Sequence, residues 1–283
     1  MGAGRWHVRR LSIRKGVRLV PAWDLSVAGK AAVVTGAGSG IGRATALALA
    51  AGGAAVCIAD LRQEAARGVA SEIERAGGRA ITAAADVSRP DDVRRLIDEA
   101  VRGLGRLDIL VNNAGLQYIA PIHEYPEDKW QLLMGVMLTG TFLCTKYALP
   151  HMIANRWGRV VNLASIHGLV ASPFKSAYTA AKHGIVGFTK VLALEVAEHG
   201  ITANAICPGY VRTPLVEGQI ADQAKVHGIP PQEVVEKIML EPAAIKRLLE
   251  PEEIAGAIRY LCSDLASGIT GTAFVVDQGW TAR

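Results

Sequence analysis

The sequence predicts an α/β fold in which a doubly wound, parallel sheet lies between two layers of helices. Short apolar runs rich in Val, Ile and Ala alternate with longer amphipathic stretches, as expected for strands buried on both faces. Hydrophobic residues make up 50% of the chain and aromatic residues only 5%, which suits close-packed helices on a sheet. At 283 residues, the chain can form one large domain, which we expect over residues 25–283, after an extension at residues 1–24.

The first predicted strand, residues 30–34, leads into a glycine-rich turn that reads Thr35-Gly-Ala-Gly-Ser-Gly-Ile-Gly42. A helix is expected from Arg43 to the pair Gly52-Gly53. The backbone N–H groups of such a turn and the helix dipole bind anions, and the glycines let a pyrophosphate approach the chain. A glycine-rich turn without a ligand is the alternative, and the next strand argues against it.

That second strand, residues 54–59, ends at Asp60. A carboxylate in this position can accept hydrogen bonds from the ribose hydroxyls of a dinucleotide, and it repels a 2′-phosphate. The sequence therefore favours NAD over NADP. Arg62 lies close enough to pair with a phosphate, but we expect it to start a solvated helix instead.

The alternation of strand and helix continues to the end of the chain. Further strands are expected at residues 79–85, 107–111, 159–164, 202–207 and 273–277. Further helices are expected at about 61–76, after the N-terminal signal Ser88-Arg89-Pro90-Asp91, after Pro126, around Tyr178 and at about 251–263. Residues 210–247 break the pattern, and their charge and proline content predicts a lid over a site.

The main catalytic signal lies where the strand at 159–164 meets the helix around Tyr178. Ser165 follows the strand at its carboxyl end, where open α/β sheets bind ligands. Tyr178 and Lys182 are four residues apart, so they share one helix face. A fixed ammonium beside a phenol favours the phenolate, which suits proton transfer. The Tyr-x-x-x-Lys spacing is weak evidence alone, and it gains weight from the serine and the nucleotide turn.

Charge and composition argue against several other functions. The net charge of +5 comes from residues 1–24, which carry six of the 31 basic residues and one of the 26 acidic residues. The rest of the chain is therefore neutral. Because nucleic-acid binding needs a basic surface, we do not expect it of the folded domain. The basic extension is open to three interpretations: a tail from an upstream start, a targeting address, or a membrane-surface anchor. Apolar runs are interrupted by Gly, Pro or charge, so no membrane span is expected. The four cysteines are scattered, which predicts free core thiols in a reducing compartment such as the cytoplasm, and no metal site.

Five motifs together resemble the short-chain dehydrogenase/reductase family over residues 31–283. They are Thr35–Gly42, Asn112–Gly115, Ser165, Tyr178 with Lys182, and Pro208-Gly209. The resemblance implies one Rossmann-type domain with seven parallel strands, assembled as a homotetramer. It implies that Tyr178 is the acid/base, that Lys182 binds the nicotinamide ribose and lowers the tyrosine pKa, and that Ser165 holds the substrate oxygen. It also implies NAD contacts from Gly36, Ser39, Gly40, Ile41, Gly42, Asp60, Asp86, Val87, Asn113, Tyr178, Lys182 and Val211.

Further residues resemble the branch of this family that oxidises D-3-hydroxybutyrate. The likeness lies in residues 112–117, 165–172, 175–178, 208–216, 219 and 279–283. It implies that Gln117, His167, Lys175 and Gln219 hold the substrate carboxylate, with Ser165, Tyr210 and Trp280 also at the substrate. An ammonium with amide and imidazole donors would fix one end of a small hydroxy acid. The implied reaction is NAD-dependent interconversion of 3-hydroxybutyrate and acetoacetate, as in ketone body metabolism.

Three features depart from this pattern. Met137 stands where the family carries an asparagine that helps to hold a water relay, and a thioether cannot replace an amide. Tyr210 stands where a tryptophan is usual, and residues 240–247 look like general members of the family. Two alternatives therefore stay open: a dehydrogenase or reductase for another alcohol or ketone, such as a 3-oxoacyl thioester or a sugar, and a nucleotide-binding subunit with weak turnover.

Overall fold

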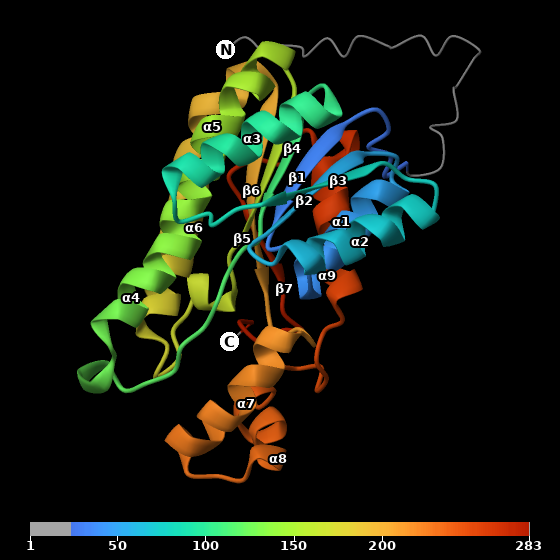
Figure 1. The fold of residues 1–283 in the computed structure, drawn as a ribbon. Helices are drawn as coiled ribbons and strands as arrows, with labels where there is room; N and C mark the ends of the chain where they lie inside the picture. The colour runs from blue at the N-terminus through green and yellow to red at the C-terminus, as the bar shows by residue number, and fades with distance from the viewer. Residues whose placement is uncertain (1–23, 283) are drawn as a thin grey trace, which may run out of the picture.

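The computed structural model describes residues 24–282 and contains one sheet of seven parallel strands between helix layers (Figure 1). The strand order is β3-β2-β1-β4-β5-β6-β7, so the direction of winding reverses between β1 and β4. The strands are β1 (Ala31–Thr35), β2 (Ala55–Asp60), β3 (Ala80–Ala84), β4 (Ile109–Asn112), β5 (Gly158–Leu163), β6 (Ile201–Pro208) and β7 (Ala273–Val276). The predicted fold class is confirmed, and each strand lies within about two residues of its predicted limits. The basic extension, apart from Asp24, lies outside the described residues.

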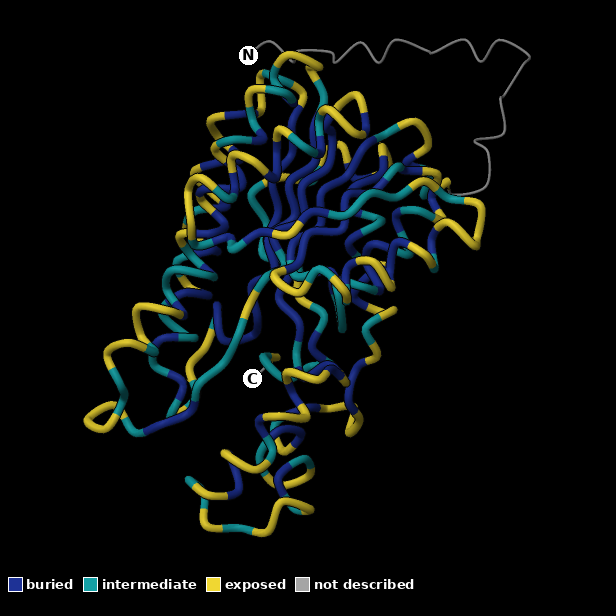
Figure 2. Tube along the Cα trace, in the orientation of Figure 1, coloured by how far each residue is buried: buried dark blue, intermediate teal, exposed yellow. Residues whose placement is uncertain are grey.

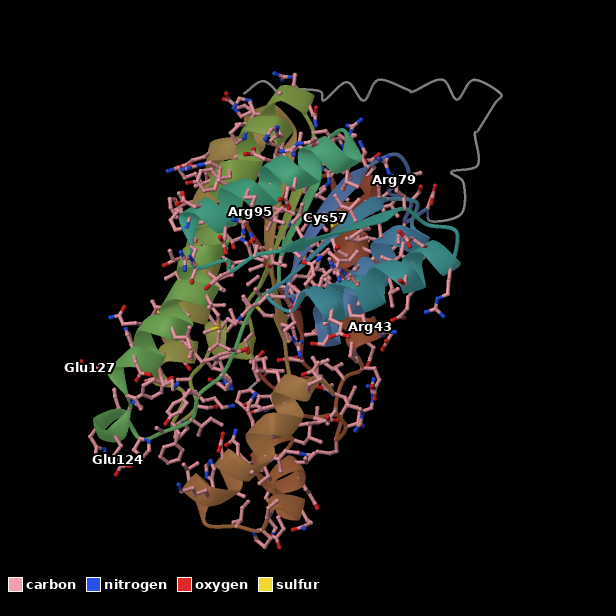
Figure 3. The ribbon with its side chains drawn as sticks, in the orientation of Figure 1. Arg43, Cys57, Arg79, Arg95, Glu124 and Glu127 are labelled. Atoms are coloured by element: carbon pink, nitrogen blue, oxygen red, sulfur yellow. The ribbon has the colours of Figure 1, made fainter. Side chains whose placement is uncertain are left out.

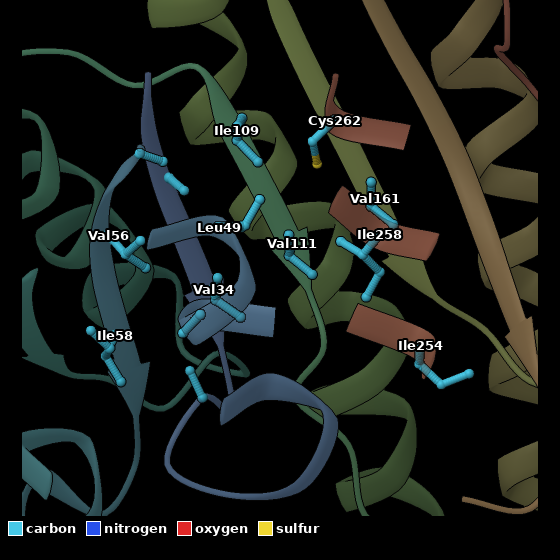
Figure 4. Close-up of a cluster of buried hydrophobic side chains, with 14 of the residues drawn as sticks. Val34, Leu49, Val56, Ile58, Ile109, Val111, Val161, Ile254, Ile258 and Cys262 are labelled. Atoms are coloured by element: carbon cyan, nitrogen blue, oxygen red, sulfur yellow. The ribbon is translucent and has the colours of Figure 1, made fainter. Parts of the chain in front are cut away.

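One face of the sheet is covered by α1 (Gly40–Ala51), α2 (Gln63–Arg75) and α9 (Pro251–Cys262). Figure 4 shows the apolar side chains that fill the layer between this face and its helices. Val34 and Ile58 come from the strands, while Leu49 and Ile258 come from the helices, and none of the four is exposed to solvent. Burial of side chains this size stabilises the layer by about 1.5–3 kcal/mol each.

The opposite face carries α3 (Pro90–Leu104), α5 (Gly140–Asn155) and α6 (Ser176–Val196). Helix α4 (Glu127–Met134) runs into α5 through the π-helical turn η2 (Gly135–Thr139). The joined helix, Glu127–Asn155, is long and apolar enough to cross a membrane by length and composition, which the sequence analysis did not anticipate. Leu143, Cys144 and Met152 of this helix pack in the core against the sheet, so it acts as a core helix of the domain.

Short helical turns complete the chain, at η1 (Ile122–Glu124), η3 (Ile166–Gly168), η4 (Ala197–His199) and η6 (Asp264–Ala266). Figure 2 shows the strands buried and the outer helix faces exposed. In Figure 3, Glu124 and Glu127 lie at the outer end of α4, whereas Cys57 lies within the sheet. Cys57 and the other three cysteines are buried and free, as predicted. Among residues 24–282, no group of three or more His, Cys, Asp or Glu side chains is placed to hold a metal ion.

Two helix starts differ from the prediction. Helix α1 begins at Gly40 rather than at Arg43, because the end of the glycine turn already has helical geometry. Helix α3 begins at Pro90 with Arg89 in the N-cap position. Ser88 does not cap this helix, because its N–H and hydroxyl both donate to Asp86 Oδ1, at 2.9 and 2.6 Å.

The predicted lid at residues 210–247 forms α7 (Pro214–His227), α8 (Pro231–Val234) and the π-helical turn η5 (Val235–Met239). These helices stand beyond the carboxyl ends of the strands (Figure 1). Helix α7 starts where the Thr213 hydroxyl accepts a hydrogen bond from the N–H of Val216, at 3.3 Å. Val234 and Met239 of this segment are fully buried in an apolar cluster that also includes Ile166 and Trp280, so the segment packs against the rest of the domain.

Candidate active site

One cavity, of about 520 Å³, lies at the carboxyl ends of the strands and contains most of the predicted site residues. This is the edge where the winding of the sheet reverses, as expected for the ligand site of a doubly wound fold. The predicted residues that line it are Gly36, Ser39, Gly40, Ile41, Asp60, Asp86, Val87, Asn113, Gln117, Ser165, His167, Lys175, Tyr178, Lys182, Tyr210, Val211 and Gln219. Gly42 and Trp280 do not line it, so the ligand contacts expected of these two residues stay predictions.

The glycine turn forms one end of the cavity and is braced by Asn113. The Asn113 amide donates to the carbonyls of Thr35 and Gly36, at 2.8 and 3.1 Å. Gly36 has a φ of +60°, and a Cβ there would lie 2.9 Å from the Cα of Ala114, so a side chain has no room. Gly42 is needed for a related reason: its Cβ would lie 2.3 Å from the Gly36 carbonyl oxygen. The absence of a side chain at Gly42 therefore allows helix α1 to pack against the glycine turn.

Asp60 places a negative charge at the end of β2, beside this turn. Its carboxylate accepts hydrogen bonds from the N–H groups of Gly38 and Arg62, both at 2.9 Å, and is only 8% exposed. The guanidinium of Arg62 lies 3.6 Å from Asp60, and its side chain is 67% exposed. Arg62 also lines the cavity, so it lies nearer to the site than the sequence suggested.

Ser165, Tyr178 and Lys182 converge where β5 and α6 meet. The Ser165 side chain hydrogen-bonds to Tyr178, and its hydroxyl accepts from the N–H of His167 at 3.1 Å. The Lys182 ammonium lies 5.4 Å from the centre of the Tyr178 ring and donates to the carbonyl of Leu163 at 2.5 Å. A phenol held by a hydroxyl and close to an ammonium can exchange a proton with a carbonyl or alcohol oxygen placed beside it.

Burial shifts the pKa of both Tyr178 and Lys182. Burial raises the pKa of Tyr178, and the hydrogen bond from Ser165 offsets this in part. Burial also lowers the pKa of Lys182 to about 8. Desolvation is therefore the main influence on both groups in this structure, and the lowering of the tyrosine pKa by Lys182 stays a prediction.

Next to this trio, Lys175 forms a buried cationic centre. Its ammonium donates to the Tyr210 hydroxyl at 2.7 Å and lies 3.3 Å from His167 Nε2, with the side chain only 2% exposed. No carboxylate among residues 24–282 pairs with it. Burial lowers its pKa to about 7. A buried cation without a counter-ion is a natural receptor for a small anion.

His167 is neutral in this site, since burial, together with the nearby Lys175 charge, lowers its pKa to about 3. An ammonium can only donate, so Nε2 of His167 accepts from Lys175 and the ring proton lies on Nδ1. That Nδ1 atom is buried and has no hydrogen-bond partner in the described part of the chain. The imidazole can therefore donate one hydrogen bond to a ligand but does not act as an acid.

Of the other predicted substrate residues, Gln117 and Gln219 border the cavity while bonding to nearby backbone. Gln117 Oε1 accepts from the N–H of Tyr118 at 3.0 Å, and Gln219 Nε2 donates to the carbonyl of Leu215 at 3.0 Å. Trp280 packs edge-on against His167, with ring centres 5.9 Å apart, and donates to the Met239 carbonyl at 3.1 Å. Trp280 thus packs against His167 without lining the cavity itself.

Met137 lies in the π-helical turn η2 and does not line the cavity, although it packs in the same apolar cluster as Tyr178. Its side chain is completely buried, and its carbonyl accepts the Thr141 hydroxyl at 2.7 Å. Sequence reasoning also missed apolar cavity walls, formed by Leu116, Leu132, Val136 and Leu215. Leu132 and Val136 are one helical turn apart on the long helix, a spacing that could have identified them.

The fold and this site define a nucleotide-dependent oxidoreductase of the α/β class, and comparison with known proteins agrees. A family model described as enoyl-(acyl carrier protein) reductase matches residues 36–281. A short-chain type dehydrogenase/reductase from Mycobacterium marinum superposes with a TM-score of 0.84 at 34% identity, over 92% of this chain and 98% of the other. The chain belongs to the short-chain dehydrogenase/reductase family, whose dehydrogenases use NAD or NADP.

Two curated relatives are similar along nearly their whole length. D-beta-hydroxybutyrate dehydrogenase of Rhizobium meliloti (strain 1021) is 44% identical, over 90% of this chain and 99% of the relative. Cis-4-hydroxycyclohexanecarboxylate dehydrogenase of Sinomonas cyclohexanicum is also 44% identical, over 89% and 97%.

Proposed function

We propose that this enzyme oxidises a short 3-hydroxy acid, 3-hydroxybutyrate, to its 3-oxo acid, acetoacetate, with NAD as hydride acceptor. The observation that carries the proposal is the unpaired, buried ammonium of Lys175 in the same cavity as Ser165 and Tyr178. A substrate with an alcohol at one end and a carboxylate at the other satisfies both parts of the cavity. A neutral alcohol leaves the cation without a counter-ion.

In this proposal each side chain has one task. Ser165 holds the substrate hydroxyl, and Tyr178 takes its proton as the alcohol becomes a carbonyl. The bound nicotinamide would supply the hydride acceptor. Lys182 would hold the nicotinamide ribose and stabilise the tyrosinate as it forms, which matters because burial opposes that charge. Lys175, with His167, Gln117 and Gln219, would fix the carboxylate so that the carbon bearing the hydroxyl is correctly placed.

The choice of NAD rests on Asp60. Its buried carboxylate lies where the adenosine ribose would bind, together with Ser39 and the glycine turn. Hydroxyl groups can donate to a carboxylate, whereas a 2′-phosphate would be repelled by it. The exposed Arg62 offsets only part of this repulsion, because solvent screens its charge.

The names of the two relatives support a carboxylate-bearing substrate. D-beta-hydroxybutyrate and cis-4-hydroxycyclohexanecarboxylate are both secondary alcohols that carry a carboxylate. Another hydroxy acid is therefore the second candidate substrate. A thioester or a sugar suits the site less well, because neither brings a terminal carboxylate to Lys175.

The test is an assay of NAD reduction by the full-length protein with 3-hydroxybutyrate, cis-4-hydroxycyclohexanecarboxylate, cyclohexanol, a 3-hydroxyacyl thioester and no substrate. We expect 3-hydroxybutyrate to have the highest kcat/KM. Preference for cyclohexanol or the thioester would contradict the proposal. Absence of turnover with all of them would favour a nucleotide-binding subunit.

We also propose that the enzyme is a cytoplasmic homotetramer. Four free, buried thiols suit a reducing compartment. Helices α5 and α6 expose Phe142, Val191 and Leu194, and the edge strand β7 exposes Val275 at 41%, which gives two separate apolar faces that a second copy could cover. A monomer in light scattering at assay concentration would contradict this assembly.

A further inference from the structure

Phe174, the residue before Lys175, has a backbone conformation that bulky side chains rarely adopt. Its φ is +67°, in the left-handed region. Arg156 also has a positive φ, but it ends helix α5 as its C-cap, where a left-handed residue is common. Phe174 instead lies at the entry to helix α6. Strained residues of this kind cluster at ligand sites and persist only where several contacts hold them.

Contacts from three segments hold Phe174 in this conformation. Its carbonyl accepts a hydrogen bond from the N–H of Ala120, in the loop after β4, at 3.1 Å. Its ring packs edge-on against the ring of His227, the last residue of the lid helix α7, with ring centres 5.4 Å apart. The next residue, Lys175, is the N-cap of α6, and its carbonyl accepts from the N–H of Thr179 at 2.8 Å. Phe174 therefore joins the loop after β4, the start of α6 and the end of α7.

The same three segments carry polar side chains that we propose to hold the substrate carboxylate. The loop after β4 contributes Gln117, the start of α6 contributes Lys175 and helix α7 contributes Gln219, and all three line the cavity. Phe174 and His227 do not line it. These two rings can therefore affect a ligand only through the segments that they join. Lys175 is the next residue in the chain, so the direction of its side chain depends most directly on the backbone of Phe174.

We propose that Phe174 is a positioning residue for the carboxylate end of the substrate. Its left-handed backbone directs the Lys175 ammonium into the cavity, and its ring holds the end of the lid helix through His227. Packing of the lid and formation of the anion site are thereby linked. The inference rests on the proposed function, because it assumes that the substrate carboxylate binds at Lys175.

The ring contact is tested at His227, because changes there leave Phe174 itself intact. His227→Ala removes the ring, and His227→Phe restores a ring without the imidazole. The readouts are KM and kcat for 3-hydroxybutyrate and for its methyl ester. We expect His227→Ala to raise KM for the acid about twofold to tenfold, the fold-change that corresponds to an aromatic pair, with kcat within about twofold.

Three further results are expected from this set of variants. The KM for the methyl ester should be nearly unaffected by His227→Ala, because the ester has no charge for Lys175 to bind. His227→Phe should keep the wild-type KM for the acid. The matched control is His199→Ala, at another half-buried histidine, which lies just before β6 at the opposite edge of the sheet and should change neither constant.

Two substitutions at Phe174 separate its ring from its backbone. Phe174→Asn removes the ring but keeps a residue that adopts the left-handed conformation readily, whereas Phe174→Val removes the ring and disfavours that conformation. We expect Phe174→Asn to match His227→Ala, and Phe174→Val to raise KM for the acid several-fold further. If the valine variant fails to fold, Phe174→Ala takes its place, since alanine also disfavours a positive φ. Equal KM values for the asparagine variant and for the valine or alanine variant would overturn the role of the backbone.

The variant that combines Phe174→Asn with His227→Ala tests whether the two rings act through one contact. If they do, its KM matches that of Phe174→Asn alone, whereas independent effects would add. Additive effects, an equal rise in KM for the ester, or a His227→Phe variant that behaves like His227→Ala would overturn the inference. A wild-type enzyme that does not oxidise hydroxy acids would overturn the proposed function together with this inference, whereas unchanged KM in all variants of an active enzyme would overturn the inference alone.

Discussion

Among single residues, Lys175 gives substrate binding a distinctive pH dependence. Its pKa is lowered to about 7 by burial, so in the free enzyme the ammonium is present below that pH and is lost above it. An anionic substrate needs the ammonium. We expect KM for 3-hydroxybutyrate to rise above pH 7, approaching about tenfold per pH unit. The methyl ester serves as control in measurements from pH 6 to 9, and a KM for the acid that is flat or falling above pH 7 would contradict this account.

Burial of the Lys175 ammonium should also lower the free energy of unfolding of the protein. The pKa of Lys175 falls from 10.5 to about 7 on folding, so the penalty is fully present below pH 7 and disappears as the pH rises toward 10.5. We expect Lys175→Met to stabilise the protein by on the order of 2–4 kcal/mol at pH 6 and by little at pH 10, while impairing binding of the acid. Thermal melts at the two pH values measure this. Equal effects at both would show that the ammonium is not desolvated.

Asp60 should decide the choice of cofactor. We expect kcat/KM with NAD to exceed that with NADP by at least about tenfold, since a like-charge contact in a partly buried site costs more than about 1.4 kcal/mol. Asp60→Ala should remove most of this preference, and Arg62→Ala should leave it or increase it. Similar efficiency with both cofactors in the wild-type enzyme would disprove the role of Asp60.

At the scale of elements, the π-helical turn η2 carries one of the departures from the pattern that the family resemblance implies. Met137 fills a fully buried position where the family resemblance implies an asparagine, and the Thr141 hydroxyl is bonded to the Met137 carbonyl. If that asparagine normally supports a water relay for the tyrosine proton, then turnover here should be slow and show a solvent isotope effect.

Met137→Asn should therefore raise kcat and reduce the isotope effect. It should also cost about 1–3 kcal/mol of stability, because an amide replaces a thioether in an apolar site. Met134→Asn, one turn earlier on the same helix, is the matched control and should leave kcat unchanged. A well-folded Met137→Asn enzyme with unchanged or lower kcat would show that Met137 is simply a core residue.

The elements also show what a sequence can predict. Strands such as β2 were predictable because they are buried on both faces and end in turn residues, a local signal. The starts of α1 and α3 were misplaced, because the geometry of the glycine turn and the bonds of Ser88 to Asp86 depend on the folded backbone. The π-helical turn η2 was missed, since no local residue pattern distinguishes it from the surrounding α-helix.

At the scale of the whole molecule, the cavity was predictable in outline because the carboxyl ends of parallel strands meet at one edge of the sheet. Motifs as distant in sequence as Gly36 and Lys182 therefore had to converge. Contacts between the lid and the rest of the domain were harder to predict from the sequence. Lys175 and Tyr210 are 35 residues apart, and only the folded chain brings the hydroxyl to the ammonium. Burial, which spacing alone does not show, is the largest cause of the raised pKa of Tyr178.

The central claim is that the cavity selects a secondary alcohol that bears a carboxylate. The most direct measurement is kcat/KM for NAD-dependent oxidation of D-3-hydroxybutyrate and of its methyl ester by the wild-type enzyme and by Lys175→Met. We predict that the wild-type enzyme prefers the acid by about 10-fold to 100-fold, the range for a charge-assisted hydrogen bond, and that Lys175→Met loses this preference while still oxidising the ester. An enzyme that oxidises the ester as well as the acid, or a Lys175→Met variant that keeps the preference, would contradict the claim.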